Sequence, residues 1–383
     1  MKSKLAVLSP EVAGGLALLL AAVAALLVVN FGGAGLYHST LEMPLTLGLP
    51  PASLQKTFHH WINDGLMVLF FVLVGIEIQR EFTTGSLKNP RHAVVPVVAA
   101  LGGFLAPAAV YLFVTRTTPD LINGWSIPTA TDIAFAVALV TVLKNYVPAS
   151  LRVFLLALAV ADDLLAILVI ALFYTSHLVW LNLFLAGAAA LLLYMKNRFG
   201  LRALWVYLVA GLFMWLCVLQ SGVHATIAGV VLGLLLPLTG NKGHPAPADV
   251  IEHALQPWVR WLILPLFAFA NVGLNLHGLS PATLFTPLTL AITLGLLLGK
   301  QLGVFGTVWM LEKTFNLPRP TGTSWRQIYG VACLCGIGFT MSLLIGSLAL
   351  SPQHQSEVRL GVLAGSILSA LIATWVLKRT KPA

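Results

Sequence analysis

Apolar stretches of about twenty residues recur along the whole of this 383-residue chain, and only the segments between them are polar. About twenty apolar residues form a helix that crosses one bilayer. Hydrophobic residues make up 58% of the chain and charged residues 9%, whereas a soluble domain carries roughly 25% charged residues. Because a soluble fold could not bury so much apolar surface, we expect membrane lipid to cover much of it. The sequence predicts an all-α polytopic membrane protein with one transmembrane domain over residues 1–383.

Lysine and arginine are distributed unevenly between alternate loops. If the first span runs outward from the cytoplasm, 18 of the 22 basic residues fall on one side, 3 on the other, and Lys300 inside a span. The positive-inside rule then predicts cytoplasmic termini and an even number of spans. This bias explains the net charge of +9 without a nucleic acid partner. The first apolar stretch, Val12 to Val29, is longer than a signal-peptide core and is interpreted as an uncut span. We expect about twelve spans, at 12–30, 58–80, 94–115, 123–143, 150–174, 180–195, 202–219, 222–238, 257–276, 287–311, 327–350 and 357–378.

Two of these spans are poorly suited to a continuous helix. The fourth contains Pro128, which lacks a backbone donor, close to Thr131 and Asp132. The eleventh contains Gly336 and Gly338 at mid-span, where glycine weakens a helix. Irregular backbone at membrane depth persists only where it is buried in protein or lines a wet cavity. Because the breaks are the middle members of spans 3–5 and 10–12, they indicate inverted repeats that cross at a transport site.

Four ionisable groups lie well inside predicted spans: Asp132, Asp162, Asp163 and Lys300. Each costs about 2.5–3.5 kcal/mol at a helix centre, so packing alone does not explain them. One interpretation is a buried ion-pair network that fixes helix register, and the other is a transport site. Lys300 could instead extend its amine toward an interface, although its mid-span position favours an aspartate partner.

Asp162 and Asp163 are neighbours on one helix and point about 100° apart, so they can face one cavity with different partners. Burial and a neighbouring negative charge both disfavour the charged form of a carboxylate, which favours proton exchange near neutral pH. A hard monovalent cation prefers oxygen ligands, which carboxylates and the hydroxyl of Thr131 can supply. We therefore expect a hard monovalent cation and H⁺ as cargo and no cofactor.

The second span ends with Glu77, Arg80 and Glu81, spaced so that they can pair along one face of a helix. This cluster is either an interfacial salt-bridge group or part of a gate. A structural role is the simpler interpretation of Asp64, near the other end of the span.

Outside that span, a few histidines and acids are candidates for a pH response. His224 stands alone in an apolar span and is either a core histidine or a proton relay. Glu252 and His253 follow a polar segment and belong either to a solvated loop or to a sensor. The longest loops are 31–57 and 239–256, and the alternation around Gly48 in the first predicts a short hairpin.

Taken in order and at membrane spacing, several segments of the chain resemble the NhaA family of bacterial sodium/proton antiporters nearly end to end. NhaA is itself among the transporters that define the inverted-repeat class, so the two indications are not independent. The segments are Trp61-Ile-Asn-Asp-Gly-Leu-Met, Val74-Gly-Ile-Glu-Ile-Gln-Arg-Glu, Ile127-Pro-Thr-Ala-Thr-Asp-Ile-Ala-Phe, Ala161-Asp-Asp, Ser221-Gly-Val-His-Ala-Thr, Leu264-Pro-Leu-Phe-Ala-Phe-Ala-Asn, Gly299-Lys and Cys335-Gly-Ile-Gly-Phe-Thr-Met-Ser.

The resemblance implies twelve helices, of which the fourth and eleventh are interrupted and cross. Asp163 would be the main Na⁺ ligand, and Asp162 would carry a proton and pair with Lys300. Asp132 and Lys300 would offset the dipole ends of the half-helices. The function implied is electrogenic, pH-regulated exchange of cytoplasmic Na⁺ or Li⁺ for external H⁺ at the bacterial inner membrane, for sodium and pH homeostasis.

The resemblance also implies a pH-responsive cytoplasmic funnel, formed by the second-span acidic cluster and the segment near Glu252, and a homodimer contact through the first outer loop. The chain departs from the family where a basic pair is expected before Glu252, and Gln256 stands where a histidine is common. We therefore expect a shallower or shifted pH response.

Two other classes of function compete with antiport. An intramembrane aspartyl protease could use Asp132 and Asp163, but it needs Gly-x-Gly-Asp, and the Gly336-Ile-Gly338 element is followed by Phe339. A channel or a sodium-coupled symporter is the other alternative, and a symporter would need a second solute.

Overall fold

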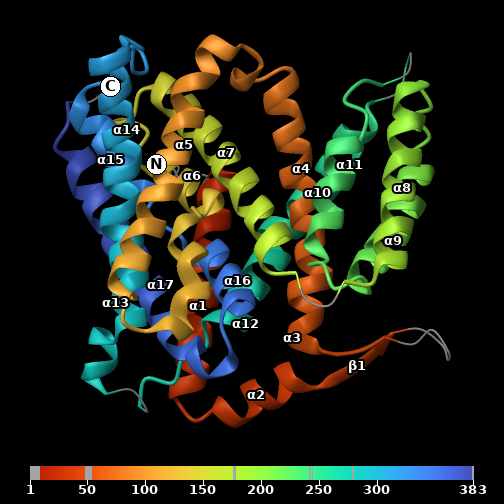
Figure 1. The fold of residues 1–383 in the computed structure, drawn as a ribbon, viewed down its shortest axis with the longest axis horizontal. Coiled ribbons are helices and arrows are strands. Elements are labelled where there is room, and N and C mark those ends of the chain that lie inside the picture. Colours follow the sequence, from red (N-terminus) through yellow and green to blue (C-terminus); the bar gives the residue numbers. More distant parts are fainter. Residues whose placement is uncertain are drawn as a thin grey trace, which may run out of the picture. The chain divides into compact units, whose positions relative to one another are not determined.

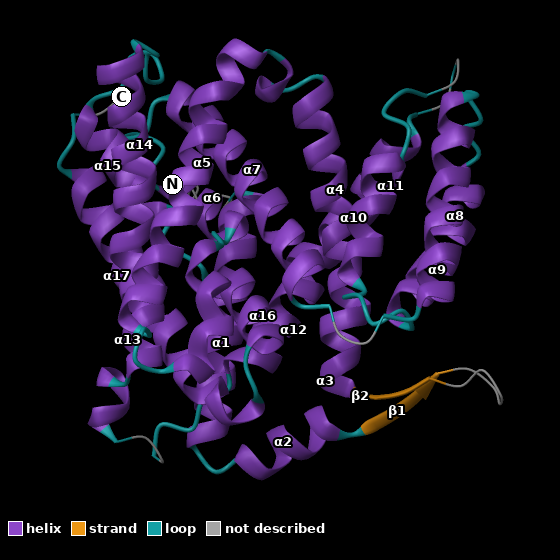
Figure 2. Cartoon of the chain, in the orientation of Figure 1, coloured by secondary structure: helices purple, strands orange, loops and turns teal. Residues whose placement is uncertain are grey.

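A computed structural model describes residues 9–47, 54–175, 178–240, 243, 245–277 and 280–381. Within these residues the regular secondary structure is helical except for one two-stranded hairpin, and loops join the elements (Figure 2). Six of the described helices are long and apolar enough to cross a membrane, and two bent helix pairs raise the number to eight if each pair is one span. Helices satisfy their own backbone groups, as hydrocarbon requires. The protein is therefore an all-α, multi-pass membrane protein, as the sequence predicts.

Contacts between residues divide the chain into two compact units. Unit 1 comprises Met1–Val23, Val94–Asp162 and Leu279–Ala383, and unit 2 comprises Ala24–Ala93 and Asp163–Gly278. Helices α1 (Pro10–Asn30) and α7 (Ala149–Phe173) pass from one unit into the other.

The other elements of unit 1 come from the middle and the last part of the chain (Figure 1). Helices α13 and α15 both pack on α17, and α16 packs on η3. Glycine allows α5 and α14 to approach closely, because a Cβ atom on Gly303 would meet the carbonyl oxygen of Gly102. The elements are α5 (Pro90–Val114, most of which belongs here), η3 (Pro119–Thr129), α6 (Ile133–Val142), η5 (Pro281–Phe285), α13 (Pro287–Leu294), η6 (Gly295–Gly299), α14 (Lys300–Phe315), α15 (Trp325–Leu334), α16 (Phe339–Ala349), η7 (Pro352–His354) and α17 (Gln355–Lys378).

The two bent pairs in unit 1 contain the breaks that the sequence marks. Elements η3 and α6 are bent by 41°, and α15 and α16 by 44°. Pro128 lies in the last turn of η3, and the break follows at Ala130 to Asp132, where both of these residues have extended backbone. The second break spans 335–338 and contains Gly336 and Gly338.

In unit 2, α10 packs along α4, and α8 pairs with α9 (Figure 1). The first contact is close because Gly75 on α4 faces Gly233 and the backbone of Val230 on α10. Tyr207 on α9 is fully buried in an apolar cluster with residues of α4 and α11. The elements are α2 (Ala34–Glu42), β1 (Pro44–Leu47), β2 (Leu54–Thr57), α3 (Phe58–Trp61), η1 (Ile62–Leu66), α4 (Met67–Thr83), η2 (Ser86–Lys88), α8 (Trp180–Arg198), α9 (Leu204–Leu219), α10 (Thr226–Leu235), α11 (Pro247–Trp258), η4 (Val259–Ile263) and α12 (Leu264–Val272).

The two longest predicted loops are more regular than the sequence analysis expected. Strands β1 and β2 form an antiparallel pair in which Pro44 lies opposite Thr57, which confirms the hairpin, although its turn around Gly48 lies outside the described residues. The same loop also contains α2, and the loop 239–256 contains most of α11. Helix α11 begins with Pro247 and has Asp249 in its first turn, both of which favour a helix start.

Candidate functional site

Asp132 joins the first turns of α6 and α16 in unit 1. One oxygen of its carboxylate accepts a hydrogen bond from the backbone N–H of Phe135, at 3.0 Å, and so caps α6. The other accepts from the N–H of Thr340, at 3.0 Å, and from its hydroxyl, at 2.5 Å, in the first turn of α16. Asp132 is only 1% exposed. A carboxylate in this place satisfies unpaired amides and offsets the positive dipole ends of both helices.

The irregular segments within the two bent helix pairs bond directly to each other. The hydroxyl of Thr131 donates to the carbonyl oxygen of Cys335 over 2.8 Å. The N–H of Asp132 donates to the carbonyl oxygen of Ile337 over 2.7 Å. Ser342 on α16 donates to the carbonyl oxygen of Ile127 in η3 over 2.7 Å. Each break thus supplies hydrogen-bond partners that the other lacks within its own helix.

Lys300 and Asp162 form a buried ion pair within unit 1. The Nζ atom of Lys300 lies 2.7 and 2.9 Å from the two carboxylate oxygens of Asp162. The side chains are 0% and 1% exposed, respectively. The partner that the sequence analysis expected for Lys300 is therefore Asp162, and the amine does not extend to an interface.

Asp163 follows Asp162 on α7 and is 2% exposed. The boundary between the two units falls between these residues. Both carboxylates are thus buried in the middle of a 25-residue apolar helix, as the sequence predicts. The ion pair of Asp162 with Lys300 therefore lies beside a second acidic residue, Asp163, on the same helix.

The acidic groups of α4 and α11 meet in unit 2 through Arg80. The guanidinium of Arg80 lies 2.8 Å from Asp249 and 2.7 Å from Glu252, both on α11. Pairing along a single helix face was expected, but the ion pairs of Arg80 run to another helix instead. Glu81 accepts hydrogen bonds from the N–H and hydroxyl of Ser86, and the side chain of Glu77 is exposed.

The other candidates for the pH response lie in the neighbouring turn of α11. Glu252 and His253 fall within the predicted loop 239–256, but they lie in the middle of a helix. The amide of Gln256 donates to Glu252 over 3.0 Å, one turn further along. The ring of His253 contacts the carbonyl oxygen of Asp249 at 3.0 Å. Asp249 was not among the predicted site residues, although its position three residues before Glu252 on one helix face was the available signal.

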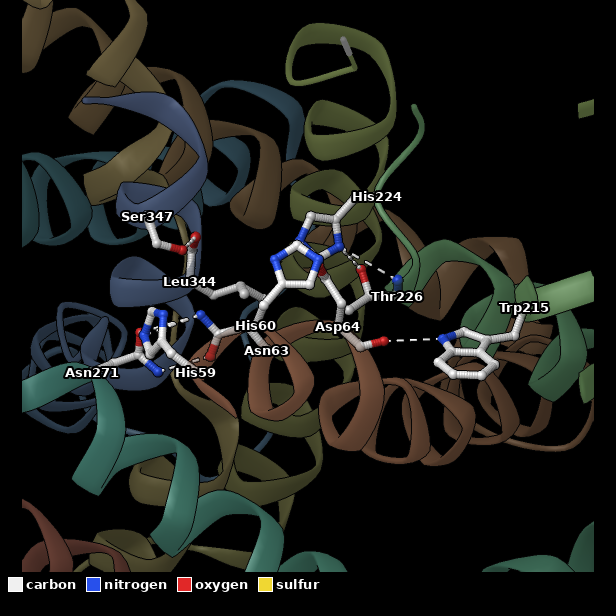
Figure 3. Close-up of polar contacts among 10 residues, drawn as sticks. All are labelled: His59, His60, Asn63, Asp64, Trp215, His224, Thr226, Asn271, Leu344 and Ser347. Carbon is white, nitrogen blue, oxygen red and sulfur yellow. Dashed lines mark hydrogen bonds and ion pairs between the residues drawn. The ribbon is translucent and has the colours of Figure 1, made fainter. Parts of the chain in front are cut away.

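Asp64 in unit 2 lies between two histidines. Its carboxylate oxygens are 2.7 Å from the ring of His60 and 3.1 Å from the ring of His224 (Figure 3). The backbone carbonyl of Asp64 accepts from the indole of Trp215, and the other ring nitrogen of His224 contacts the hydroxyl of Thr226 at 2.8 Å. His224 is thus a buried histidine with polar partners, and Asp64 is a structural centre that ties η1 to α9 and to the start of α10.

A second cluster of polar side chains, which includes Asn63, lies next to the Asp64 cluster (Figure 3). The side-chain amide of Asn271 on α12 donates to Asn63 over 3.0 Å, and its oxygen lies 3.0 Å from the ring of His59. Sequence reasoning did not single out these three residues. A polar asparagine at the end of the apolar run 264–272 was the signal that could have found them.

Comparison with known proteins adds a direct line of evidence. The family model described as Na+/H+ antiporter 1 matches residues 6–377. The chain is 50% identical over 381 residues to the Na(+)/H(+) antiporter NhaA of Rhodospirillum rubrum, covering 97% of this chain and 96% of that one. It is 48% identical over 365 residues to the protein of the same name from Pseudomonas fluorescens, covering 94% and 92%. It is 47% identical over 380 residues to NhaA 2 of Magnetococcus marinus, covering 97% and 96%. The resemblance inferred from the motifs is confirmed, and the chain belongs to the NhaA family of Na⁺/H⁺ antiporters.

Proposed function

We propose that this protein exchanges cytoplasmic Na⁺, or Li⁺, for external H⁺ across the bacterial inner membrane. The exchange is electrogenic and pH-regulated, and it serves sodium and pH homeostasis. The observation that carries this proposal is the fully buried Lys300–Asp162 ion pair, which stands beside Asp163 on one membrane helix. Buried charge of this kind is expensive in a bilayer and marks an ion pathway.

In this mechanism, Asp163 is the main Na⁺ ligand and exchanges its proton for the cation. Carboxylate oxygens suit a hard cation, and the same oxygens can hold a proton when the cation has left. Asp162 is a further Na⁺ ligand, and with Lys300 it carries the second proton. Return of two protons for one Na⁺ moves one net charge, so the membrane potential drives the exchange. Transport of this kind forms no covalent bond, so the protein acts as a carrier and not as an enzyme.

Asp132 and Thr131 hold the two breaks together in this mechanism. Both oxygens of Asp132 already cap half-helices, and the hydroxyl of Thr131 already donates to Cys335. These contacts support a positioning role, in which Asp132 stabilises the crossing of two interrupted spans while other carboxylates bind the cargo. Pro128 and Gly336 allow the backbone to leave helical geometry at that crossing.

The pH response belongs, in this proposal, to the ion pairs of Arg80 with Asp249 and Glu252. Protonation of either carboxylate would weaken the connection between α4 and α11. Gln256 bonds to Glu252 but does not titrate, which supports a shallower or shifted response than a histidine there would give. Glu81, His253 and His224 remain candidates for the same response.

We also propose a topology of twelve spans, in which spans 3–5 and 10–12 are inverted repeats and both termini are cytoplasmic. The two helix pairs bent at 130–132 and 335–338 support this arrangement, because they occupy the middle place in each triplet. A homodimer through the β1–β2 hairpin is part of the proposal.

The experiment is a transport assay on purified protein in liposomes, with internal pH followed by a trapped fluorescent dye. Sodium added outside wild-type vesicles should make the lumen more alkaline, because each entering Na⁺ is exchanged for protons that leave, and Asp163→Asn should abolish the change. Asp120→Asn is the matched control, because Asp120 is an exposed aspartate at the start of η3, and it should transport normally.

The pH dependence of the same assay tests whether the ions share carboxylates. The sodium concentration for half-maximal exchange should rise as pH falls from 9 to 6, by up to tenfold per unit for each proton displaced. Transport that persists in Asp163→Asn, or a sodium affinity that is flat over this range, would sink the proposal.

A further inference from the structure

A polar pocket of about 610 Å³ opens in unit 1, where the start of α15 approaches the end of α17. Its wall includes Pro148, the turn before α15, and residues 379–381 at the end of the chain that the structure describes. Nothing in the antiport mechanism above uses it. The residues that line it are Pro148, Arg319, Gly322, Thr323, Ser324, Arg326, Gln327, Arg379, Thr380 and Lys381.

Four of these residues are basic, and none is acidic. Arg319 forms an ion pair with Glu312, whose carboxylate lies 3.6 Å from Nε, which is too long for a good hydrogen bond. The Nη1 atom of Arg319 is buried and has no hydrogen-bond partner among the described residues. Four positive charges around one open pocket favour an anionic occupant.

The hydroxyl groups of the wall do not compensate this charge, because they are neutral. Thr323 donates to the carbonyl oxygen of Pro320, and Thr380 to that of Leu377. Ser324 exchanges hydrogen bonds with Gln327 in a capping box at the start of α15. The charge of the pocket lining is therefore that of its four basic side chains, of which Arg319 is also paired with Glu312 outside the lining.

Aromatic side chains place the pocket at the boundary between water and lipid. The guanidinium of Arg379 stacks on Trp375 at 4.1 Å, and that of Arg319 stacks on Trp325 at 4.6 Å. Trp375 is 57% exposed on α17. Tryptophan and arginine at the end of a membrane helix are typical of the interface, where one end of the side chain is apolar and the other wet.

An apolar path leads along α17 to this pocket. Ile367, Leu371 and Trp375 are 56%, 61% and 57% exposed and are spaced four residues apart, and Arg379 follows at the same interval. Residues four apart lie on one face of a helix. An acyl chain lying on this face would therefore bring its headgroup to Arg379.

We propose that this pocket binds the phosphate of an anionic phospholipid, with the acyl chains along α17. The four basic side chains supply charge-assisted hydrogen bonds to the phosphate, and the exposed face of α17 supplies the apolar contact that a free phosphate could not use. The pocket would hold lipid on unit 1 independently of the ion-exchange groups.

Native mass spectrometry of the full-length protein in detergent tests this site, with phosphatidylglycerol or phosphatidylcholine titrated in. The wild type should bind phosphatidylglycerol more tightly than phosphatidylcholine. The double substitution Arg326→Gln with Arg379→Gln should weaken phosphatidylglycerol binding about 30-fold, because each basic residue near an anionic headgroup contributes about fivefold. Lys381→Gln, at the exposed end of the wall, should weaken it about fivefold.

Arg116→Gln with Arg260→Gln is the matched control, because it removes two arginines that do not line the pocket. It should bind phosphatidylglycerol as the wild type does. Inorganic phosphate at millimolar concentration should not displace the lipid. Equal binding of the two lipids, equal loss in the control and the pocket variants, or displacement by inorganic phosphate would each overturn the proposal. Because the readout is lipid binding, it stands or falls separately from the proposed transport.

Discussion

The buried pair of Lys300 and Asp162 gives the sharpest prediction. Asp162→Asn leaves the amine of Lys300 at 0% exposure without its two carboxylate contacts of 2.7 and 2.9 Å. Loss of one member of such a pair costs about 3–5 kcal/mol of stability, because the remaining charge is buried and uncompensated. Replacing both, by Asp162→Asn with Lys300→Gln, removes both charges. The double variant should therefore be much more stable than the sum of the single effects indicates.

The same double variant has a defined consequence for transport. If the pair carries the second proton, its removal leaves Asp163 to exchange one proton for one Na⁺, with no net charge moved. A carrier that moves one net charge gains about 2.3 kcal/mol per 100 mV, which is about fiftyfold in the sodium gradient. The double variant should still exchange Na⁺ for H⁺ at Asp163, with a weaker sodium affinity because one ligand is lost, and it should lose this fiftyfold response.

The assay combines thermal unfolding of the purified variants with sodium uptake by liposomes under a potassium diffusion potential. Arg80→Gln with Glu252→Gln is the matched control, since that pair is 40% and 21% exposed and should couple by less than about 1 kcal/mol. Coupling between Lys300 and Asp162 no larger than in this control would refute the stability argument. Potential-driven uptake that persists in the double variant would show that the second proton travels elsewhere.

Two further predictions concern the packing around the helix breaks and between helices. Thr340→Val removes the hydroxyl that donates to Asp132 at 2.5 Å and should lower the free energy of unfolding by about 1.5–3 kcal/mol. Thr141→Val loses a hydrogen bond within its own helix and should lower it by less than about 1 kcal/mol, as measured by thermal unfolding. Equal losses in the two variants would contradict the special role of the contact with Asp132. Gly75→Ala places a methyl group against the backbone of α10 and should cost about 1–3 kcal/mol. Gly187→Ala on α8, with open space at its Cβ position, should be neutral or stabilising, and an equal loss in both glycine variants would contradict the close packing.

Much of the fold could be predicted from the sequence because the membrane imposes a strong local rule. A backbone in hydrocarbon must satisfy its own hydrogen bonds, so each long apolar stretch is a helix whatever surrounds it. The breaks were also visible, because Pro128, Gly336 and Gly338 weaken a helix through their own backbone chemistry. The loops were predicted less well, because they contain the short helices α2 and α11. A short helix in a polar segment shows few repeats of the apolar pattern, and neither helix has a side chain that caps its first turn.

The candidate charges followed from the sequence, but their partners did not. A charged residue in an apolar run is costly wherever it lies, so Asp132, Asp162, Asp163 and Lys300 stand out without any structure. The pairing of Lys300 with Asp162 is decided by packing between elements 138 residues apart in the chain.

Three other contacts show the same dependence on tertiary structure. The carboxylate of Asp132 caps a helix that begins more than 200 residues later, next to Thr340. Arg80 reaches across to α11 rather than along its own helix, and Asp64 lies between histidines from different segments. Local sequence determines which residues need a partner, because desolvation acts on each group by itself. Tertiary structure decides which partner each one meets, because a contact of about 3 Å depends on how distant helices pack.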